Sequence, residues 1–158
     1  MYLLGVDLGS SSVKVALVKA DSQKCVAVSQ QPKTEMKIDA PHHGWAEQNP
    51  EDWWSYFKLA LKDILTSSQA KPEEILGIGI SYQMHGLVIV DEEKNVLRPS
   101  IIWCDGRASE IGKNAFKRIG NSKCLTHFLN SPGNFTASKL KWVKDNEPEV
   151  YKLSLIHI

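Results

Sequence analysis

The chain has 158 residues with 19 basic and 18 acidic side chains, and its formal net charge is +1. This balance argues against a nucleic-acid-binding protein and against docking on an anionic membrane. Hydrophobic residues make up 42% of the chain, as in ordinary globular proteins of about one domain. Three cysteines without CxxC spacing disfavour a disulfide framework or a zinc site. Asp7 interrupts the apolar run that follows Met1, which argues against a secretory signal peptide. We therefore expect a cytoplasmic protein.

The first part of the chain predicts three short strands. Apolar residues fill Tyr2–Val6, alternate with other residues over Val13–Val18, and recur in Cys25–Val28. Turn-forming residues separate these segments, so the strands form an antiparallel meander. Residues 33–48 show no clean period and predict a surface loop.

Helices are predicted next. Asn49 is a good N-cap and Pro50 suits the first helical position, so a helix begins there and ends near Ser68. Its apolar residues recur at helical spacing. Two further helices are expected over residues 109–119 and 136–146.

The remaining apolar segments predict more strands. Ile75–Ile80 is apolar without alternation, which is typical of a strand covered on both faces. Residues 87–90 and 101–103 read as two shorter strands, with a turn over Asp91–Asn95 between them. Together these elements predict an α/β layered domain, a mixed sheet with buried central strands and helices packed on it.

The first motif that could carry chemistry lies between the first two strands, at residues 7–14. Gly9 allows the backbone to approach an anion, and the N–H groups and hydroxyls of Ser10, Ser11 and Ser12 could point at phosphate oxygens. Asp7 could hold Mg²⁺ directly or through water. A serine-rich hairpin turn with a capping aspartate explains these residues equally well.

Two further motifs follow predicted strands. In Ser81–Gly86, Gln83 and His85 can donate and accept hydrogen bonds, and Met84 offers an apolar contact to a sugar. In Trp103–Arg107, an indole could pack on a sugar face while the charged groups of Asp105 and Arg107 bind hydroxyls. The alternatives are a turn with a satisfied histidine, and a core tryptophan beside an ion pair. The adjacent histidines of residues 42–48 indicate packing and a helix start, not a metal site.

Taken together, these motifs resemble the FGGY family of carbohydrate kinases, over residues 1 to about 151. The similar segments are GVDLGSSSVKV, GWAEQNPEDWW, ISYQMHG, IIWCDGR and SPGNFTASKLKWVKDNEP. The resemblance implies a ribonuclease H-like, actin-like ATPase fold. It also implies a kinase that uses ATP and Mg²⁺. The Gln-Met-His-Gly segment resembles the branch of the family that phosphorylates D-xylulose, although Tyr82 stands where a small residue is expected.

The resemblance assigns roles to the motifs. Asp7 would support catalysis and bind Mg²⁺, and the turn Gly9, Ser10, Ser11 and Ser12 would meet the ATP phosphates. Four residues would contact the sugar: Met84, His85, Trp103 and Asp105. The nucleotide turn and the sugar corner should therefore face one cleft. The small-molecule substrate would be D-xylulose, without nucleic acid or membrane, and a homodimer is compatible with the full-length protein.

The resemblance also predicts that the chain is incomplete. Residues 1–152 would form part of the N-terminal kinase domain, and residues 153–158 would be a non-native tail whose letters match the end of a transposon adapter. A natural short C-terminus is the alternative. The catalytic base and the adenosine pocket would then lie outside the chain, and the fragment alone would be inactive. Two other readings stay open: a related kinase for ribulose, gluconate or fuculose, and a non-catalytic ATP-binding module of the actin or chaperone type.

Overall fold

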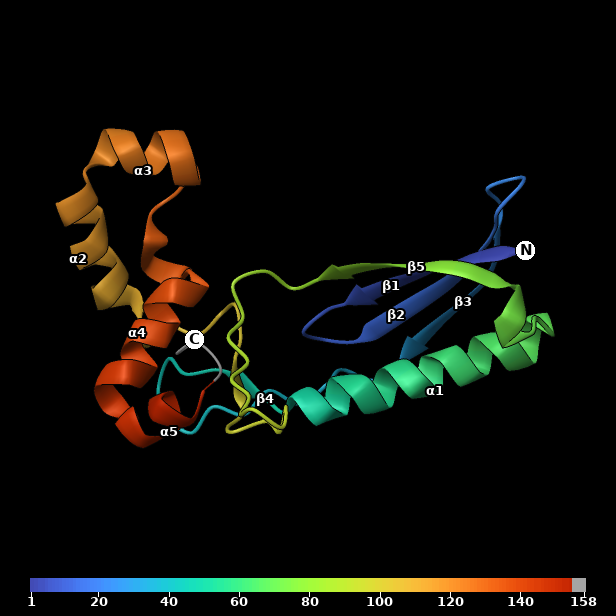
Figure 1. Ribbon diagram of the computed structural model, residues 1–158, viewed down its shortest axis with the longest axis horizontal. Helices are drawn as coiled ribbons and strands as arrows, with labels where there is room; N and C mark the ends of the chain where they lie inside the picture. Colours follow the sequence, from blue (N-terminus) through green and yellow to red (C-terminus); the bar gives the residue numbers. More distant parts are fainter. Residues whose placement is uncertain (155–158) are drawn as a thin grey trace. The chain divides into compact units, whose positions relative to one another are not determined.

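A four-stranded mixed sheet organises the N-terminal half of the chain, in the computed structural model that describes residues 1–154 (Figure 1). Strands β1 (Tyr2–Leu8), β2 (Val13–Lys19) and β3 (Cys25–Gln31) form an antiparallel meander, as the sequence predicts. Strand β5 (Ile75–Tyr82) runs parallel to β1, so the strand order is β3-β2-β1-β5.

Helix α1 (Pro50–Ser68) lies along one face of this sheet (Figure 1). Paired residues of neighbouring strands point to the same face, and Ser29 is paired with Val15. The Ser29 hydroxyl donates a hydrogen bond of 2.8 Å to the Asp63 carboxylate of α1. This places α1 over the face that holds the strand core. The core residues of that face and of the helix are Leu4, Val6, Val13, Val15, Leu17, Trp53, Ala60 and Ile64.

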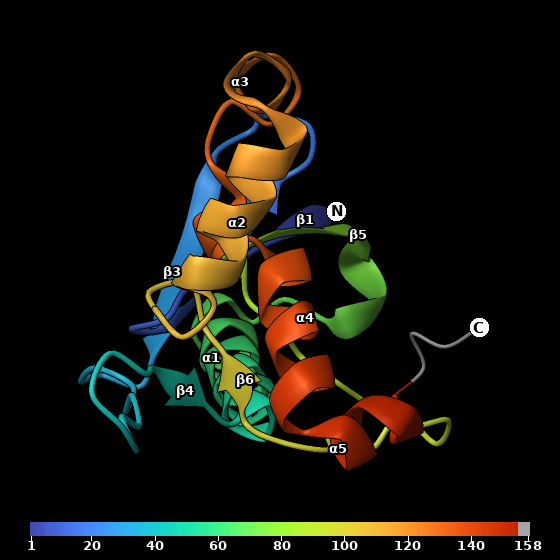
Figure 2. The same cartoon turned by 90° about the vertical axis from the view of Figure 1, so that its left-hand side faces the viewer.

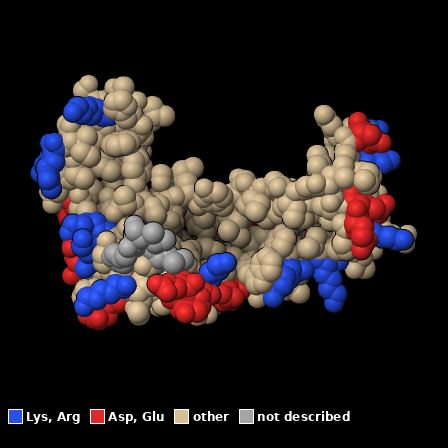
Figure 3. Space-filling view, in the orientation of Figure 1, with Lys and Arg blue, Asp and Glu red and all other residues tan. Residues whose placement is uncertain are grey.

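The prediction that the β5 segment is covered on both faces is wrong for the described chain. Ile78 and Ile80 are 59% and 67% exposed. The reason is topological, because β5 is an edge strand of the sheet formed by residues 1–154 and α1 lies over the strands beside it. The segment Ile75–Tyr82 carries no charged residue, and the surface over β5 is almost free of charged side chains in Figure 3.

The chain divides into two compact units. The sheet and most of α1 form the first unit, from Met1–Lys37 and Glu51–Gln83, and the second combines Ile38–Pro50 with the chain from Met84 onward. The second unit holds a two-stranded sheet of β4 (Glu47–Gln48) and β6 (Ser100–Ile101), and several helices (Figure 2). These helices are α2 (Ser109–Ile119), α3 (Asn121–Phe128), α4 (Thr136–Asn146) and α5 (Pro148–Leu153).

Both helices predicted for this region, 109–119 and 136–146, are confirmed with their bounds. Helix α3 was not foreseen. Two short 3-10 helices, η1 (Pro72–Glu74) and η2 (Pro132–Asn134), complete the elements. No helix within the described residues is long and apolar enough to cross a membrane.

The predicted strand over residues 87–90 is wrong. This segment makes only single bridges, from Leu87 to Ile101 and from Val90 to Val96. Its apolar side chains instead form a compact core: Leu87 and Ile89 are buried with Ile101 and with Val143 of α4. Packing onto a helix, and not pairing along a ladder, explains the apolar run. The turn that follows is confirmed, since the Asp91 N–H donates to the Asn95 carbonyl at 3.1 Å.

The strand predicted over residues 101–103 is shorter and begins one residue earlier, as β6. It ends because the Asp105 N–H donates back to the Ile102 carbonyl and turns the chain. The loop expected over residues 33–48 ends in β4, where Glu47 and Gln48 are buried. In the predicted non-native tail, Leu153 ends α5, and residues 155–158 lie outside the described chain.

Candidate functional site

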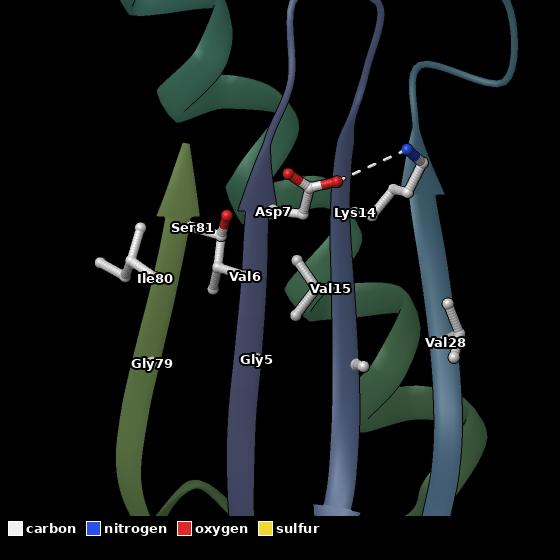
Figure 4. A pocket seen from close by; sticks show the side chains of 10 residues that line it. Gly5, Val6, Asp7, Lys14, Val15, Val28, Gly79, Ile80 and Ser81 are labelled. Carbon is white, nitrogen blue, oxygen red and sulfur yellow. Dashed lines mark ion pairs between the residues drawn. The ribbon is translucent and has the colours of Figure 1, made fainter. Parts of the chain in front are cut away.

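The turn between β1 and β2, residues 7–14, presents two opposite charges. The register pairs Asp7 with Lys14, so both side chains lie on the sheet face opposite α1. The Asp7 Oδ2 atom is 3.5 Å from the Lys14 Nζ atom (Figure 4). Both side chains are about half exposed, at 51% and 49%. A pair this exposed contributes little to stability, and both charges are accessible to a ligand.

The backbone of this turn is closed tightly at Gly9. The Gly9 N–H donates to the Ser12 carbonyl at 3.1 Å, and a Cβ atom on Gly9 would lie 3.0 Å from the same oxygen. A side chain there would crowd the turn. The Ser12 side chain is buried, and its hydroxyl has no hydrogen-bond partner among the residues that the structure describes. Such a group is costly unless a ligand or water satisfies it.

The same sheet face is hollowed next to the Asp7–Lys14 pair (Figure 4). Gly5, Ala16 and Gly79 are direct neighbours across β1, β2 and β5. These small residues line the bottom of the hollow. Lys14 was part of the predicted turn but received no role from the sequence. The strand register, which the alternation of β2 already indicates, is the signal that places it beside Asp7.

The second group of predicted residues begins at the Met84–Gly86 corner, which follows β5. Met84 is 66% exposed. His85 has a left-handed backbone with φ 64°, a conformation that is uncommon for a residue with a side chain. Its ring is stacked on Phe135 with a centroid distance of 4.8 Å and an interplanar angle of 24°. The corner therefore presents an exposed apolar side chain next to a fixed imidazole.

Trp103 and Asp105 lie in one turn but in contrasting environments. Trp103 is 46% exposed, and its carbonyl accepts a hydrogen bond from the Asn134 side chain. Asp105 is buried, and its Oδ2 atom accepts a hydrogen bond of 2.6 Å from the Ala46 N–H. The Arg107 guanidinium donates to both Asp105 oxygens over 2.8–3.0 Å. Trp103 is accessible to a ligand, whereas the carboxylate of Asp105 already has protein partners.

Asp105 belongs to a buried cluster of paired charges. The Oε1 atom of Glu47 forms ion pairs with the Nη2 atom of Arg107 at 2.7 Å and with the Nη2 atom of Arg98 at 2.6 Å. The Arg107 guanidinium also stacks on the Trp45 ring, 3.7 Å from its centroid. Buried charges are tolerated when they are paired in this way. The prediction that residues 42–48 serve packing agrees with this position of Trp45.

Lys139 of α4 is a functional candidate that the sequence reasoning missed. The side chain is fully buried, and its ammonium group donates to the His85 carbonyl at 2.7 Å and to the Ile102 carbonyl at 2.9 Å. Burial lowers the pKa of Lys139 from 10.5 to about 8, while the nearby charge of Asp105 acts in the opposite direction. A lysine within KLKW carries no signal that distinguishes it from the exposed Lys141.

The predicted site residues thus fall into two groups, one in each unit. Asp7 and residues 9–12 belong to the first unit, and Met84, His85, Trp103 and Asp105 to the second. Within the second unit, Lys139 links the segments that carry the sugar candidates. The sequence predicts that Asp7 and His85 face one cleft, and this stays a prediction. No group of three metal-ligating side chains of the His, Cys, Asp or Glu types occurs within residues 1–154.

Comparison with known proteins identifies relatives over the whole chain. The sequence profile of the FGGY family of carbohydrate kinases, N-terminal domain, matches residues 2–155. The chain is 37% identical over 152 residues to xylulose kinase of Escherichia coli K12, covering 96% of this chain and 30% of that protein. It is 35% identical to xylulose kinase of Bacillus subtilis 168, covering 99% and 31%. The chain therefore spans about a third of the length of these relatives.

Solved structures agree with the sequence comparison. A xylulose kinase from Brucella ovis superposes with a TM-score of 0.85 and 33% identity, covering 98% of this chain and 31% of that chain. A gluconate kinase from Lactobacillus acidophilus has a TM-score of 0.81 at 24% identity, which supports the fold alone. The α/β prediction of a ribonuclease H-like, actin-like ATPase fold is thus confirmed. From the profile match and these identities, the chain belongs to the FGGY family of carbohydrate kinases, with similarity to their N-terminal domain.

Proposed function

We propose that this chain is the N-terminal part of a kinase that transfers the γ-phosphoryl group of ATP to a hydroxyl group of D-xylulose. The observation that carries the proposal is the Met84–Gly86 corner, where an exposed methionine adjoins a histidine whose ring and carbonyl are both held in place. The relatives named xylulose kinase in Escherichia coli and Bacillus subtilis support this substrate.

The β1–β2 turn is the proposed site for the nucleotide phosphates. Its glycine and serines offer backbone N–H groups and hydroxyls to phosphate oxygens, and the buried hydroxyl of Ser12 has no hydrogen-bond partner among the described residues. The exposed carboxylate of Asp7 suits Mg²⁺, which proteins bind through one or two carboxylates together with substrate phosphates. The metal would offset phosphate charge during transfer. The accessible ammonium group of Lys14 would add a second positive charge, besides the proposed Mg²⁺, at the same place.

For the sugar, we propose direct contacts from Met84, His85 and Trp103. The methionine and the indole present apolar surface to the carbon-bound hydrogens, and the imidazole exchanges hydrogen bonds with hydroxyls. Asp105 was also predicted as a sugar contact, and this stays a prediction. Its saturated carboxylate favours an indirect role, in which it fixes Arg107 and the turn that presents Trp103.

Phosphoryl transfer also needs a carboxylate that takes the proton of the attacking hydroxyl. We propose that this group and the adenosine pocket are supplied outside residues 1–158, and that the chain alone is inactive. A coupled ADP-release assay on the purified chain should show no sugar-dependent turnover, and turnover would refute this point. A cytoplasmic location and a homodimeric full-length enzyme stay predictions.

The deciding experiment is His85→Ala in the full-length protein, assayed for ADP release with D-xylulose. We expect the KM for D-xylulose to rise at least tenfold while the KM for ATP stays within twofold. His127→Ala is the matched control, because His127 is an exposed histidine of α3 in the same unit.

The alternatives give different results in the same assay. ADP release that does not depend on any sugar, and survives His85→Ala, would indicate an actin-like or chaperone-like ATP-binding module. A panel with ribulose, gluconate and fuculose separates the related kinases. A higher kcat/KM for one of these sugars would overturn the xylulose assignment.

A further inference from the structure

The first turn of α4 contacts the backbone of the Met84–Gly86 corner. Thr136 and Lys139 are three residues apart and therefore lie on one face of the helix. The Thr136 hydroxyl donates to the Gly86 carbonyl at 3.2 Å, and the Lys139 ammonium donates to the His85 carbonyl at 2.7 Å. We propose that Thr136 and Lys139 are positioning residues, which hold the corner in the conformation that binds the sugar. This inference rests on the proposed function of the corner.

Lys139 holds a second segment at the same time. Its ammonium also donates to the Ile102 carbonyl at 2.9 Å, and Ile102 directly precedes Trp103. Together with the backbone bridge between Leu87 and Ile101, this buried cation fixes the distance between the backbone that carries His85 and the backbone that carries Trp103. Sites that recognise a small polar ligand need such fixed distances, because small displacements of the contact residues reduce binding and rate strongly.

The conformation of His85 explains why the corner needs a restraint. A left-handed backbone at a residue with a side chain is sparsely populated and persists only where its surroundings hold it. Here Lys139 holds the carbonyl and Phe135 stacks on the ring. Phe135 immediately precedes α4, so the beginning of this helix restrains His85 from two directions.

The charges around Lys139 favour a protonated ammonium near neutral pH. The carboxylate of Asp105 stabilises the cation, whereas burial and the positive charge of Arg107 oppose it, and the pKa is about 8. A protonated lysine has three N–H donors and no acceptor, which suits a position between two carbonyl oxygens. Its geometry and its charge therefore agree with a positioning role that does not require contact with the sugar.

The test uses Lys139→Met and Thr136→Val in the full-length protein. Lys139→Met keeps the length of the aliphatic chain but removes the donors. Thr136→Val removes the hydroxyl of an exposed residue and leaves a side chain of similar volume. We expect the KM for D-xylulose to rise about tenfold for Lys139→Met, which loses two hydrogen bonds, and about threefold for Thr136→Val, which loses one. The KM for ATP should stay within twofold, a split that a general loss of structure would not produce.

Two matched variants serve as controls. Lys141→Met changes an exposed lysine of the same helix, which pairs only with Asp145 on the surface in the described residues. Thr126→Val changes an exposed threonine of α3. Both should leave the two KM values within twofold of the unchanged protein. If Lys139→Met does not fold, the milder Thr136→Val carries the test.

A second measurement separates this inference from the proposed function. Hydrogen exchange of a peptide covering residues 84–90 should become about tenfold faster in Lys139→Met, without any substrate, but not in Lys141→Met. If the unchanged enzyme does not phosphorylate D-xylulose, the proposed function fails while the exchange still tests the anchoring. Unchanged exchange in both Lys139→Met and Thr136→Val would overturn the inference, as would equal changes in the KM values for sugar and ATP.

Discussion

Gly112 of α2 lies where this helix meets η2, and we expect Gly112→Ala to destabilise the second unit. A Cβ atom at this position would lie 2.0 Å from Gly133 Cα, 2.5 Å from Gly133 N and 2.7 Å from the Pro132 carbonyl oxygen. All three atoms belong to the backbone of η2, so no side-chain rotation relieves the clash. The helix and η2 therefore have to move apart.

The structure gives the size of this effect. Real Cβ atoms essentially never approach closer than 3.0 Å, so the contact of 2.0 Å must open by at least 1.0 Å, the difference between the two. Overpacking of this kind costs up to about 3 kcal/mol, and the rigid backbone places Gly112 at the upper end. Alanine gains about 1 kcal/mol over glycine inside a helix. The net loss should be about 2 kcal/mol, which lowers the Tm by about 4–8 °C.

Urea unfolding followed by tryptophan fluorescence, together with a thermal melt, measures this loss. Gly133→Ala is the matched control from the other side of the same contact. A Cβ atom there would have its nearest neighbours at 3.9 Å, the Ser109 carbonyl oxygen and the Ser131 hydroxyl. We expect Gly133→Ala to change the free energy of unfolding by less than about 1 kcal/mol. The reasoning is refuted if Gly112→Ala is as stable as the unchanged chain, or if Gly133→Ala is the more damaging variant.

Three other predictions concern charge and the sheet edge. Because the pKa of Lys139 is about 8 in the fold and 10.5 when unfolded, the unfolded chain binds more protons between these values. Stability should therefore rise from pH 8 to 10.5, by up to about 3 kcal/mol relative to Lys139→Met in urea titrations. Glu47→Gln removes the carboxylate between two buried arginines and should cost about 3 kcal/mol, whereas Glu149→Gln, at an exposed pair, should cost under about 0.5 kcal/mol in the same titration. The uncovered β5 edge should make the chain associate with rising concentration in light scattering, and Ile78→Lys should reduce this.

Local patterns predicted most of the regular elements. The alternation of Val13–Val18 places its apolar side chains on one face, and the observed register of β2 follows from it. Pro50 begins α1, and helices 109–119 and 136–146 have their predicted bounds. Each of these signals depends on residues within one or two helical turns or within one strand. They can therefore be recognised without knowledge of the tertiary structure.

Patterns with two physical explanations misled the prediction. The apolar run at residues 87–90 suits either a strand or a segment packed on a helix, and contact with Val143 decides for packing. The apolar run at residues 75–80 correctly predicts a strand. Whether both faces of that strand are buried depends on elements that are distant in sequence. Helix α3 was missed because Asn121–Phe128 has only 8 residues and too few apolar positions to show a period.

The site shows the same division between local and distant information. The turn at residues 7–14 and the corner at residues 84–86 could be singled out because their glycines and polar residues are adjacent in sequence. The environment of Asp105 could not be foreseen, since its contacts come from Ala46, which is 59 positions away, as well as from Arg107. A sequence shows that Asp105 and Arg107 are close, but not that their charges are buried.

Lys139 shows how a local rule that fails can indicate function. A helical surface pattern would leave a lysine in solvent, because burying an ammonium group is costly. The structure buries it completely, and two backbone carbonyls and the charge of Asp105 compensate. An apolar side chain of similar length could fill the same space without a buried charge, but it could not hold the carbonyls of His85 and Ile102. The fold thus places a buried cation where it joins two proposed sugar-binding segments, which is where positioning affects function directly.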